Sequence, residues 1–294
     1  MNDFVVMGAP VDCVGRPGGN ELAPMVLRQC GVIDAIKPKL DLNDLSVRIQ
    51  GEDRDPESGL KGAASVVTMT AEVRRAVAAQ MAQGNKPVIL GGCCSYVMGA
   101  VSAARDVIGR VGLVYIDGHL DLYDGSTSPS GECADMPLAI MLGRGPRILD
   151  ESMGKHPVDA QDVSLIGYRD RYLAQPVGSL MPEDFGPEFH HHDDKAVLAI
   201  GATVIADEIL EHQAKNAGKY WIHLDWDVLG EQALPSADYP MPGGLDWDTL
   251  GKLIRPLVQS SSMIGMSFAC YNPDKDINRL DARRIVTSIQ HMFN

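Results

Sequence analysis

The chain has 294 residues, of which 45% are hydrophobic and 22% are charged, and its formal net charge at pH 7 is -13. These fractions are those of an ordinary globular protein, and a chain of this length can bury enough surface to fold without a disulfide or zinc staple. The negative charge argues against nucleic acid and against anionic membrane surfaces as partners.

Short apolar runs rich in β-branched residues alternate with helical segments along the chain. The runs lie at 4–7, 87–90, 112–116, 163–166, 221–224 and 263–268, and the helical segments at 63–83, 96–108, 202–216 and 247–259. Continuous apolar runs are typical of strands buried on both faces of a parallel sheet. The alternation predicts one α/β domain over residues 1–294, a doubly wound, three-layer α/β/α sandwich.

The loosest stretch of the chain, residues 172–194, contains several prolines and glycines and includes the triplet His190, His191 and His192. We expect a surface excursion that can include a helix. Such a triplet can bind a metal ion, but in a flexible polar loop a solvated state is favoured.

The six cysteines form no CxxC pair and no zinc-ribbon spacing; they are Cys13, Cys30, Cys93, Cys94, Cys133 and Cys270. We expect a reducing compartment, with most of the thiols packed as small apolar residues. The N-terminus, MNDFVVMGAP, lacks the basic and apolar regions of a signal peptide. The most apolar run, 197–206, is too short to span a bilayer, and we therefore expect a cytoplasmic protein.

Two clusters of acidic residues follow predicted strands. The run 112–116 leads into Asp117, His119 and Asp121, and the run 221–224 leads into Asp225 and Asp227. Ligands of open parallel sheets bind outside the carboxyl ends of the strands. Because alternate side chains of an extended segment point the same way, the members of each cluster can converge.

Four carboxylates and one imidazole in one place repel one another unless positive charge is present. Two divalent cations would compensate that repulsion and keep the ligands ionised. Mixed carboxylate and imidazole ligands suit manganese, zinc, iron or nickel better than calcium. A single aspartate in such a position can also cap a turn or a helix, but two motifs at two strand ends favour a metal site.

A third element, GGCCS at 91–95, directly follows the run 87–90. Glycines allow the backbone to turn sharply there, and Ser95 is a candidate cap for the helix that follows. Cys94 would then point to the same edge as the aspartates. The alternative is that Cys94 is a buried structural thiol.

These motifs resemble the ureohydrolase superfamily, which includes arginases and agmatinases, and the resemblance covers nearly the whole chain. It rests on GNELAP at 19–24, GGCCS at 91–95, DGHLD at 117–121, SGECADMPL at 130–138, HLDWDVL at 223–229, PGGL at 242–245 and NP at 272–273. The resemblance implies a three-layer α/β/α fold with an eight-stranded, mainly parallel sheet. It also implies a binuclear manganese centre and a homo-oligomer, a trimer or hexamer.

Carried over by position, the resemblance implies a role for each candidate ligand. Asp117 and Asp225 would bridge two metals, Asp121 would join Cys94 on one of them, and His119 and Asp227 would complete the other. In the family, a hydroxide shared by the metals attacks a guanidinium carbon and urea is released. Asp121 would orient that hydroxide and shuttle its proton.

Cys94 stands where the family normally has a histidine. Thiolate is a softer ligand, so zinc, iron or nickel compete with manganese as the expected metal. A thiolate at this place, together with the stretch 221–229, also resembles the N-hydroxyarginine amidinohydrolases of the superfamily.

The substrate positions depart further from the arginase pattern. Ala134 replaces the family's proton-shuttling histidine, so Glu132 and Asp135 become catalytic candidates, although both can equally be solvated loop carboxylates. Cys270 replaces the glutamate that binds the guanidinium group in arginases, and an unpaired guanidinium in a closed pocket is costly. The expected substrate-binding residues are Ser130, Asp135, Tyr239 and Cys270.

We therefore expect a metal-dependent hydrolase of a C–N bond in a small guanidino or amidino compound, acting through a metal-bridging hydroxide. An N-hydroxyarginine-type amidinohydrolase is one alternative. A catalytically silent superfamily member, which binds a ligand or pairs with an active subunit, is another. A metal-storing or redox-sensing protein using Cys93 and Cys94 is less favoured, because vicinal cysteines are poorly placed to form a disulfide with each other.

Overall fold

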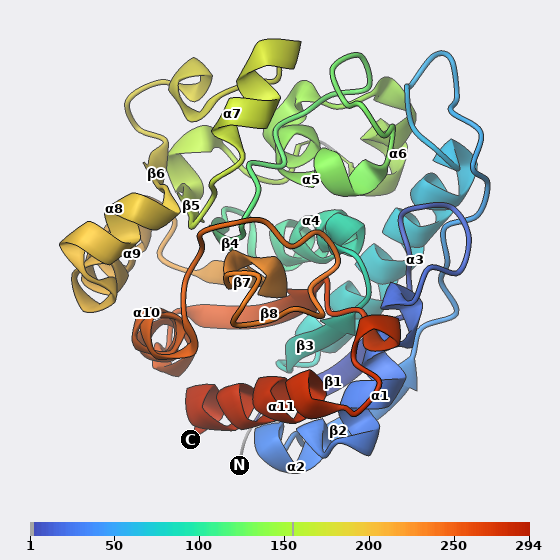
Figure 1. Ribbon diagram of the computed structural model, residues 1–294. Helices are drawn as coiled ribbons and strands as arrows, with labels where there is room; N and C mark the ends of the chain where they lie inside the picture. The colour runs from blue at the N-terminus through green and yellow to red at the C-terminus, as the bar shows by residue number, and fades with distance from the viewer. Residues whose placement is uncertain (1–2, 155) are drawn as a thin grey trace.

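The computed structural model describes residues 3–154 and 156–294 and contains one eight-stranded sheet (Figure 1). Its strands are β1 (Phe4–Ala9), β2 (Leu40–Asp44), β3 (Lys86–Gly91), β4 (Gly112–Ile116), β5 (Val163–Ile166), β6 (His190–His192), β7 (Tyr220–Asp225) and β8 (Met263–Ala269). Their order is β2-β1-β3-β8-β7-β4-β5-β6, and every neighbouring pair is parallel. The predicted α/β fold is confirmed.

Helices cover both faces of the sheet. They are α1 (Ala23–Gln29), α2 (Val32–Ile36), α3 (Ala63–Met81), α4 (Val97–Ile108), α5 (Pro137–Ala139), α6 (Asp150–Met153), α7 (Arg171–Ala174), α8 (Asp194–Ile200), α9 (Ala202–Asn216), α10 (Trp247–Gln259) and α11 (Leu280–Phe293). Figure 1 shows α3 and α4 on one side of the sheet and α10 and α11 on the other. Each face has its own buried hydrophobic cluster.

The strands found in the sequence are present, but two short ones were missed. The six apolar runs correspond to β1, β3, β4, β5, β7 and β8. The edge strands β2 and β6 lack a buried apolar run: β2 is largely exposed, and β6 consists of three half-buried histidines. The expectation of a solvated loop for His190, His191 and His192 is thus wrong, since these residues pair in register with Ser164, Leu165 and Ile166 of β5.

The strand order brings four chemically important segments to one edge of the sheet. Strands β3, β8, β7 and β4 are consecutive neighbours, so their carboxyl ends lie side by side. Cys94 follows β3, Cys270 follows β8, Asp225 ends β7 and Asp117 follows β4. Segments far apart in the chain therefore meet where open α/β sheets bind their ligands.

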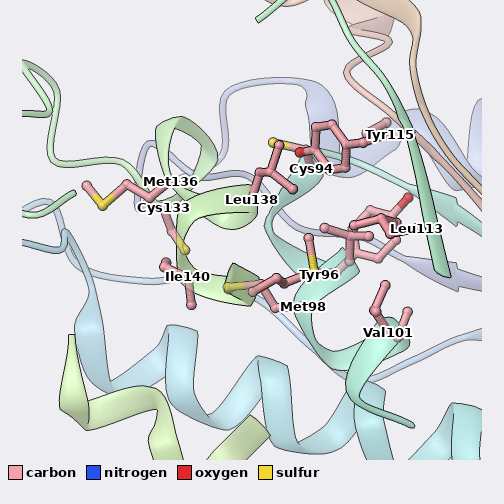
Figure 2. Close-up of a cluster of buried hydrophobic side chains, with 14 of the residues drawn as sticks. Cys94, Tyr96, Met98, Val101, Leu113, Tyr115, Cys133, Met136, Leu138 and Ile140 are labelled. Carbon is pink, nitrogen blue, oxygen red and sulfur yellow. The ribbon is translucent and has the colours of Figure 1, made fainter. Parts of the chain in front are cut away.

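A buried hydrophobic cluster supports this edge from one face of the sheet (Figure 2). It includes Cys94 and Tyr96, together with Leu113 and Tyr115 of β4. Tyr96 packs so closely on Gly91 that a Cβ atom there would lie 1.9 Å from its ring. Only glycine fits at this point, because any side chain would push the ring off the strand.

The structure places a disulfide between Cys13 and Cys93, with their Cα atoms 6.0 Å apart. Most thiols were expected to be reduced, and that expectation fails for these two because the loop after β1 folds back onto the end of β3. Ser95 contacts Cys13 through its hydroxyl, at 2.7 Å, instead of capping the following helix. Among the described residues, no helix combines the length and apolar character needed to cross a bilayer.

The disulfide predicts the number of reactive thiols. Denatured, unreduced protein should show four thiols, and reduced protein six. Cys13→Ser should release its partner and raise the unreduced count to five. It should also lower the free energy of unfolding by about 2–4 kcal/mol, because the bond closes a long loop. Titration with a thiol reagent checks this, and six thiols in unreduced wild type would contradict it.

Candidate metal centre

A cavity of about 270 Å³ lies at the carboxyl ends of the central strands. All six metal ligands expected from the sequence line its wall; they are Cys94, Asp117, His119, Asp121, Asp225 and Asp227. Five of the six side chains are buried, and that of His119 is 23% exposed. The structure therefore brings together residues from β3, β4 and β7 and the segments after them.

His119 stands between two carboxylates. Its Nδ1 lies 3.0 Å from Asp227 Oδ2 and 3.6 Å from Asp117 Oδ1. Burial would lower the pKa of His119, but these carboxylates raise it well above its usual value. Burial conversely would raise the pKa of Asp227, yet His119 and Arg169 hold it below its usual value. Without metal, this imidazole is the main positive charge within the cavity.

Asp117 and Asp225 lack comparable compensation. Burial and then the neighbouring carboxylates raise the pKa of both side chains well above the usual value. Asp117 Oδ1 accepts a hydrogen bond from the backbone of His119, at 2.7 Å, whereas Oδ2 has no partner among the described residues. A buried carboxylate oxygen without a partner is unfavourable, so this atom is available to a cation.

Two further residues, neither of them predicted as a ligand, lie among the candidate donors. His223 lies two residues before Asp225 on β7, on the same side of the strand, and its Nε2 has no partner among the described residues. Its donor atom gathers with those of Asp117 and Asp225, all within 4.8 Å of one another. The alternation already applied to Asp225 and Asp227 extends back to His223 and would have revealed it.

Cys270 is the second addition. Its Sγ lies with Cys94 Sγ and a carboxylate oxygen of Asp225, all within 4.8 Å. Although a hydrogen bond to Cys270 would lower the pKa of Cys94, burial and the nearby carboxylates raise it well above its usual value. We expected Cys270 on the substrate side, but the structure places its thiol among the candidate ligands.

Asp121 lines the cavity beside the other carboxylates. It adopts a left-handed backbone conformation, with φ of 52°, so the segment after β4 is not extended throughout as the sequence analysis assumed. Its carboxylate accepts a hydrogen bond from Tyr115, at 2.6 Å. Burial raises the pKa of Asp121 to about 8. Strained backbone of this kind concentrates at functional sites.

Arg169 and Asp170 hold the two acidic segments together. Arg169 Nη2 donates to the backbone carbonyl of Asp227, at 2.7 Å, and Asp170 accepts from the backbone of Leu120, at 3.0 Å. A Cβ at Gly118 would lie 2.4 Å from the Arg169 guanidinium. Glycine is therefore required for the guanidinium to reach the Asp227 segment.

The expected catalytic and substrate residues fall into two groups. Ser130, Asp135 and Tyr239 line the cavity, as does Ala134. Asp135 accepts hydrogen bonds from Ser128, at 2.5 Å, and Ser130, at 2.6 Å, while burial raises its pKa.

Glu132 belongs to the other group, because it does not line the cavity. One of its carboxylate oxygens lies 3.0 Å from Lys61 Nζ, and the other accepts from the hydroxyl of Tyr239, at 2.9 Å. With both oxygens engaged, Glu132 is placed to fix Tyr239 at the rim of the cavity.

The donor set fits a pair of divalent cations. Two groups of donor atoms share Asp225, and two share Asp117: Cys94–Asp225–Cys270, Asp117–His223–Asp225 and Asp117–His119–Asp227. Buried carboxylates with raised pKa values and an oxygen without a partner are relieved by bound cations. The mixture of thiol, imidazole and carboxylate suits zinc, iron and manganese better than calcium.

Comparisons with known proteins extend over the whole chain. The family model described as the arginase family matches residues 2–293. An arginase from Brevibacillus brevis is 28% identical over 294 residues, which are 98% of this chain and 96% of that protein.

Two solved structures share the fold. An arginase from Bacillus caldovelox matches with a TM-score of 0.88 at 23% identity, over 100% of this chain and 99% of that one. Formimidoylglutamase from Bacillus subtilis subsp. subtilis str. 168 matches with a TM-score of 0.75 at 18% identity, over 100% and 86%.

The carboxylates predict how the stability of metal-free protein depends on pH. Because the pKa of Asp121 rises from 3.8 to about 8 on folding, the folded state keeps a proton that the unfolded chain loses near pH 4. This stabilisation is complete below about pH 4 and is lost as the pH rises through about 8. Metal-stripped protein should therefore melt several degrees lower at about pH 8 than at about pH 6.

Differential scanning calorimetry on stripped and manganese-loaded protein checks this. The gain from manganese should grow with pH, since cations bind the ionised ligands, and Asp121→Asn should flatten the profile of stripped protein. A melting temperature of stripped protein that rises over this range would contradict the prediction.

Proposed function

The chain belongs to the arginase family, and on that basis we propose that it is a metal-dependent hydrolase of a C–N bond in a small guanidino or amidino compound. The convergence of thiol, imidazole and carboxylate donors on shared Asp117 and Asp225 carries this proposal. The buried Oδ2 of Asp117 has no partner among the described residues, and a bound cation would supply one.

We assign the metal ligands by these groups. Asp117 and Asp225 are the shared ligands, His119 and Asp227 serve one cation, and Cys94 serves the other, with Asp121 close by. His223 and Cys270 are additional candidates on the two sides of Asp225. Bound divalent cations would supply electrophilic assistance and a water-derived nucleophile near neutral pH.

Asp121 is the best placed group for proton transfer. It lines the cavity among the candidate metal ligands, where a carboxylate can accept a proton from a bound water and return it to a leaving group. Tyr115 holds the carboxylate in place through its hydroxyl group. This function replaces the one that the family's histidine has at the position of Ala134.

Asp135 is the best placed carboxylate to meet a cationic substrate. The hydroxyl groups of Ser128 and Ser130 fix its Oδ2, and the side chain lines the cavity, whose described wall residues include no lysine or arginine. Tyr239, held by Glu132, stands at the same wall. We propose that this wall orients the amidino group.

The thiols favour a substrate other than ordinary arginine. Cys270 lies against Cys94 and so offers no carboxylate to a guanidinium group at that place. This observation favours a modified guanidino compound, such as N-hydroxyarginine, as the narrower proposal. A cytoplasmic homo-oligomer stays part of the proposal, supported by membership of the family.

A substrate screen tests the proposal. Manganese- or zinc-loaded protein should hydrolyse at least one of four compounds. It should release urea from arginine or agmatine, hydroxyurea from N-hydroxyarginine, or formamide from an N-formimidoyl amino acid. Asp225→Asn should lower that activity at least about a thousandfold, because it removes a shared ligand of both cations. The matched control is Asp248→Asn, since Asp248 is an exposed residue on α10 that does not line the cavity. Fully loaded protein that hydrolyses none of the compounds would favour the catalytically silent alternative.

The relative affinity for manganese and zinc tests whether Cys94 is a metal ligand. Cys94→His should strengthen manganese binding at least about tenfold and weaken zinc binding, because imidazole is a harder ligand than thiolate. Cys133→Ala is the control, since Cys133 is a buried thiol that does not line the cavity. Unchanged affinities for both metals in Cys94→His, measured by calorimetric titration, would show that Cys94 is no ligand.

A further inference from the structure

A second group of metal-binding side chains lies away from the cavity, where the edge strand β6 meets helix α9 (Figure 1). His190 and His192 stand at alternate positions of β6, so they point to the same side of the strand. Glu208 and His212 are four residues apart on α9 and lie one above the other on one face. We call these four residues the β6–α9 cluster.

The side chains of the β6–α9 cluster converge. His192 Nε2 lies 3.0 Å from Glu208 Oε2, and the donor atoms of His190, His192 and Glu208 all lie within 4.8 Å of one another. The donors of a tetrahedral zinc ion are about 3.3 Å apart, so small side-chain rotations bring the three atoms around one ion. We propose that the β6–α9 cluster is a binding site for zinc or a similar borderline divalent cation.

The structure already orients the imidazole of His190 for this purpose. Its Nδ1 lies 3.0 Å from the hydroxyl oxygen of Ser164, and that oxygen also accepts from Gln213, at 3.1 Å. With Nδ1–H donating to Ser164, the lone pair of Nε2 is free to bind a cation. Hydrogen bonds of this kind to the other ring nitrogen are the usual companions of metal-bound histidine.

His212 acts as a positioning residue. Its ring stacks on that of His190, with centroids 4.8 Å apart and an angle of 22° between the planes. This stacking and the contact with Ser164 both restrict rotation of the His190 ring.

The composition and exposure of the cluster select the kind of ion. Two imidazoles and one carboxylate suit zinc, and leave a fourth position for water. The side chains of His192 and Glu208 are 20% and 42% exposed, so an ion can enter from solvent. None of the four residues lines the carboxylate cavity, and β6 ends the sheet while β4 and β7 lie inside it. Binding here is therefore independent of the proposed hydrolase centre.

A bound ion would also stabilise the edge of the sheet. Strand β6 has three residues and pairs with β5 alone. An ion held by His190 and His192 from β6 and by Glu208 from α9 would cross-link the strand to a helix on the sheet's face. Because the ion binds the folded state preferentially, zinc should raise the melting temperature.

Zinc titration of full-length protein whose carboxylate centre is first saturated with manganese tests the proposal. Wild type should bind one zinc ion more per chain than the double variant His190→Ala/His192→Ala. His191→Ala is the matched control, because His191 points to the other side of β6, toward Tyr168, and it should bind zinc as wild type does. Glu208→Gln, a milder change on a partly exposed helix position, should weaken zinc binding at least about tenfold even if the double variant fails to fold.

Cobalt identifies the ligands independently of the manganese centre. In an Asp225→Asn background, Co²⁺ bound to the β6–α9 cluster should give ligand-field bands without a thiolate charge-transfer band. Glu208→Gln should weaken these bands strongly at a cobalt concentration that just saturates the parent variant. Equal zinc stoichiometry and affinity in wild type, Glu208→Gln and the double variant would overturn the proposal. So would cobalt spectra that show thiolate coordination alone, whatever the outcome of the substrate screen.

Discussion

The repulsion among buried carboxylates at the ends of β4 and β7 is the constraint on which the rest of the site depends. Asp117, Asp121, Asp225 and Asp227 are each at most 5% exposed and line one cavity. His119 offsets part of their charge from within the cavity. Burying carboxylates so close together is unfavourable unless they are protonated or neutralised, and this makes cation binding and proton binding competing ways to stabilise the same residues.

The surrounding fold holds these groups close despite their repulsion. Parallel pairing of β4 with β7 fixes the two acidic segments side by side, and Arg169 ties the backbone after β7 to the segment after β4 through its contact with Gly118. Beneath them, Tyr115 and Tyr96 belong to a packed apolar cluster (Figure 2). Such packing keeps the ligands from moving apart. Without a cation, the carboxylates reduce their repulsion by binding protons instead. The pKa shifts of Asp121 and Asp225 are the result.

Much of the fold and part of the metal site can be derived from the sequence, because both depend on local patterns. Continuous apolar runs identify buried strands, and acidic residues directly after them mark the ligand edge. Details that depend on tertiary contacts were out of reach. The approach of Cys270 to Cys94 and the engagement of Glu132 by Lys61 each involve segments distant in the chain. The left-handed turn falls on Asp121, where no glycine marks it in the sequence. No periodicity in the sequence reports such contacts.

The histidine triplet is a second case in which tertiary contacts override the local sequence pattern. Three consecutive polar residues resemble a loop, yet register with β5 makes His190–His192 a strand whose alternate side chains meet α9. A family resemblance gives no guidance there, since it describes the shared centre and not the edges of the sheet.

The central claim is that the buried carboxylates and Cys94 are ligands of two cations. A crystal structure of protein grown with manganese, with anomalous diffraction recorded at the manganese edge, tests it most directly. The account predicts two anomalous peaks within the cavity, with carboxylate oxygens of Asp117 and Asp225 bound to both ions and Cys94 Sγ within bonding distance of one. Crystals grown with manganese that show no anomalous density in the cavity would contradict the claim.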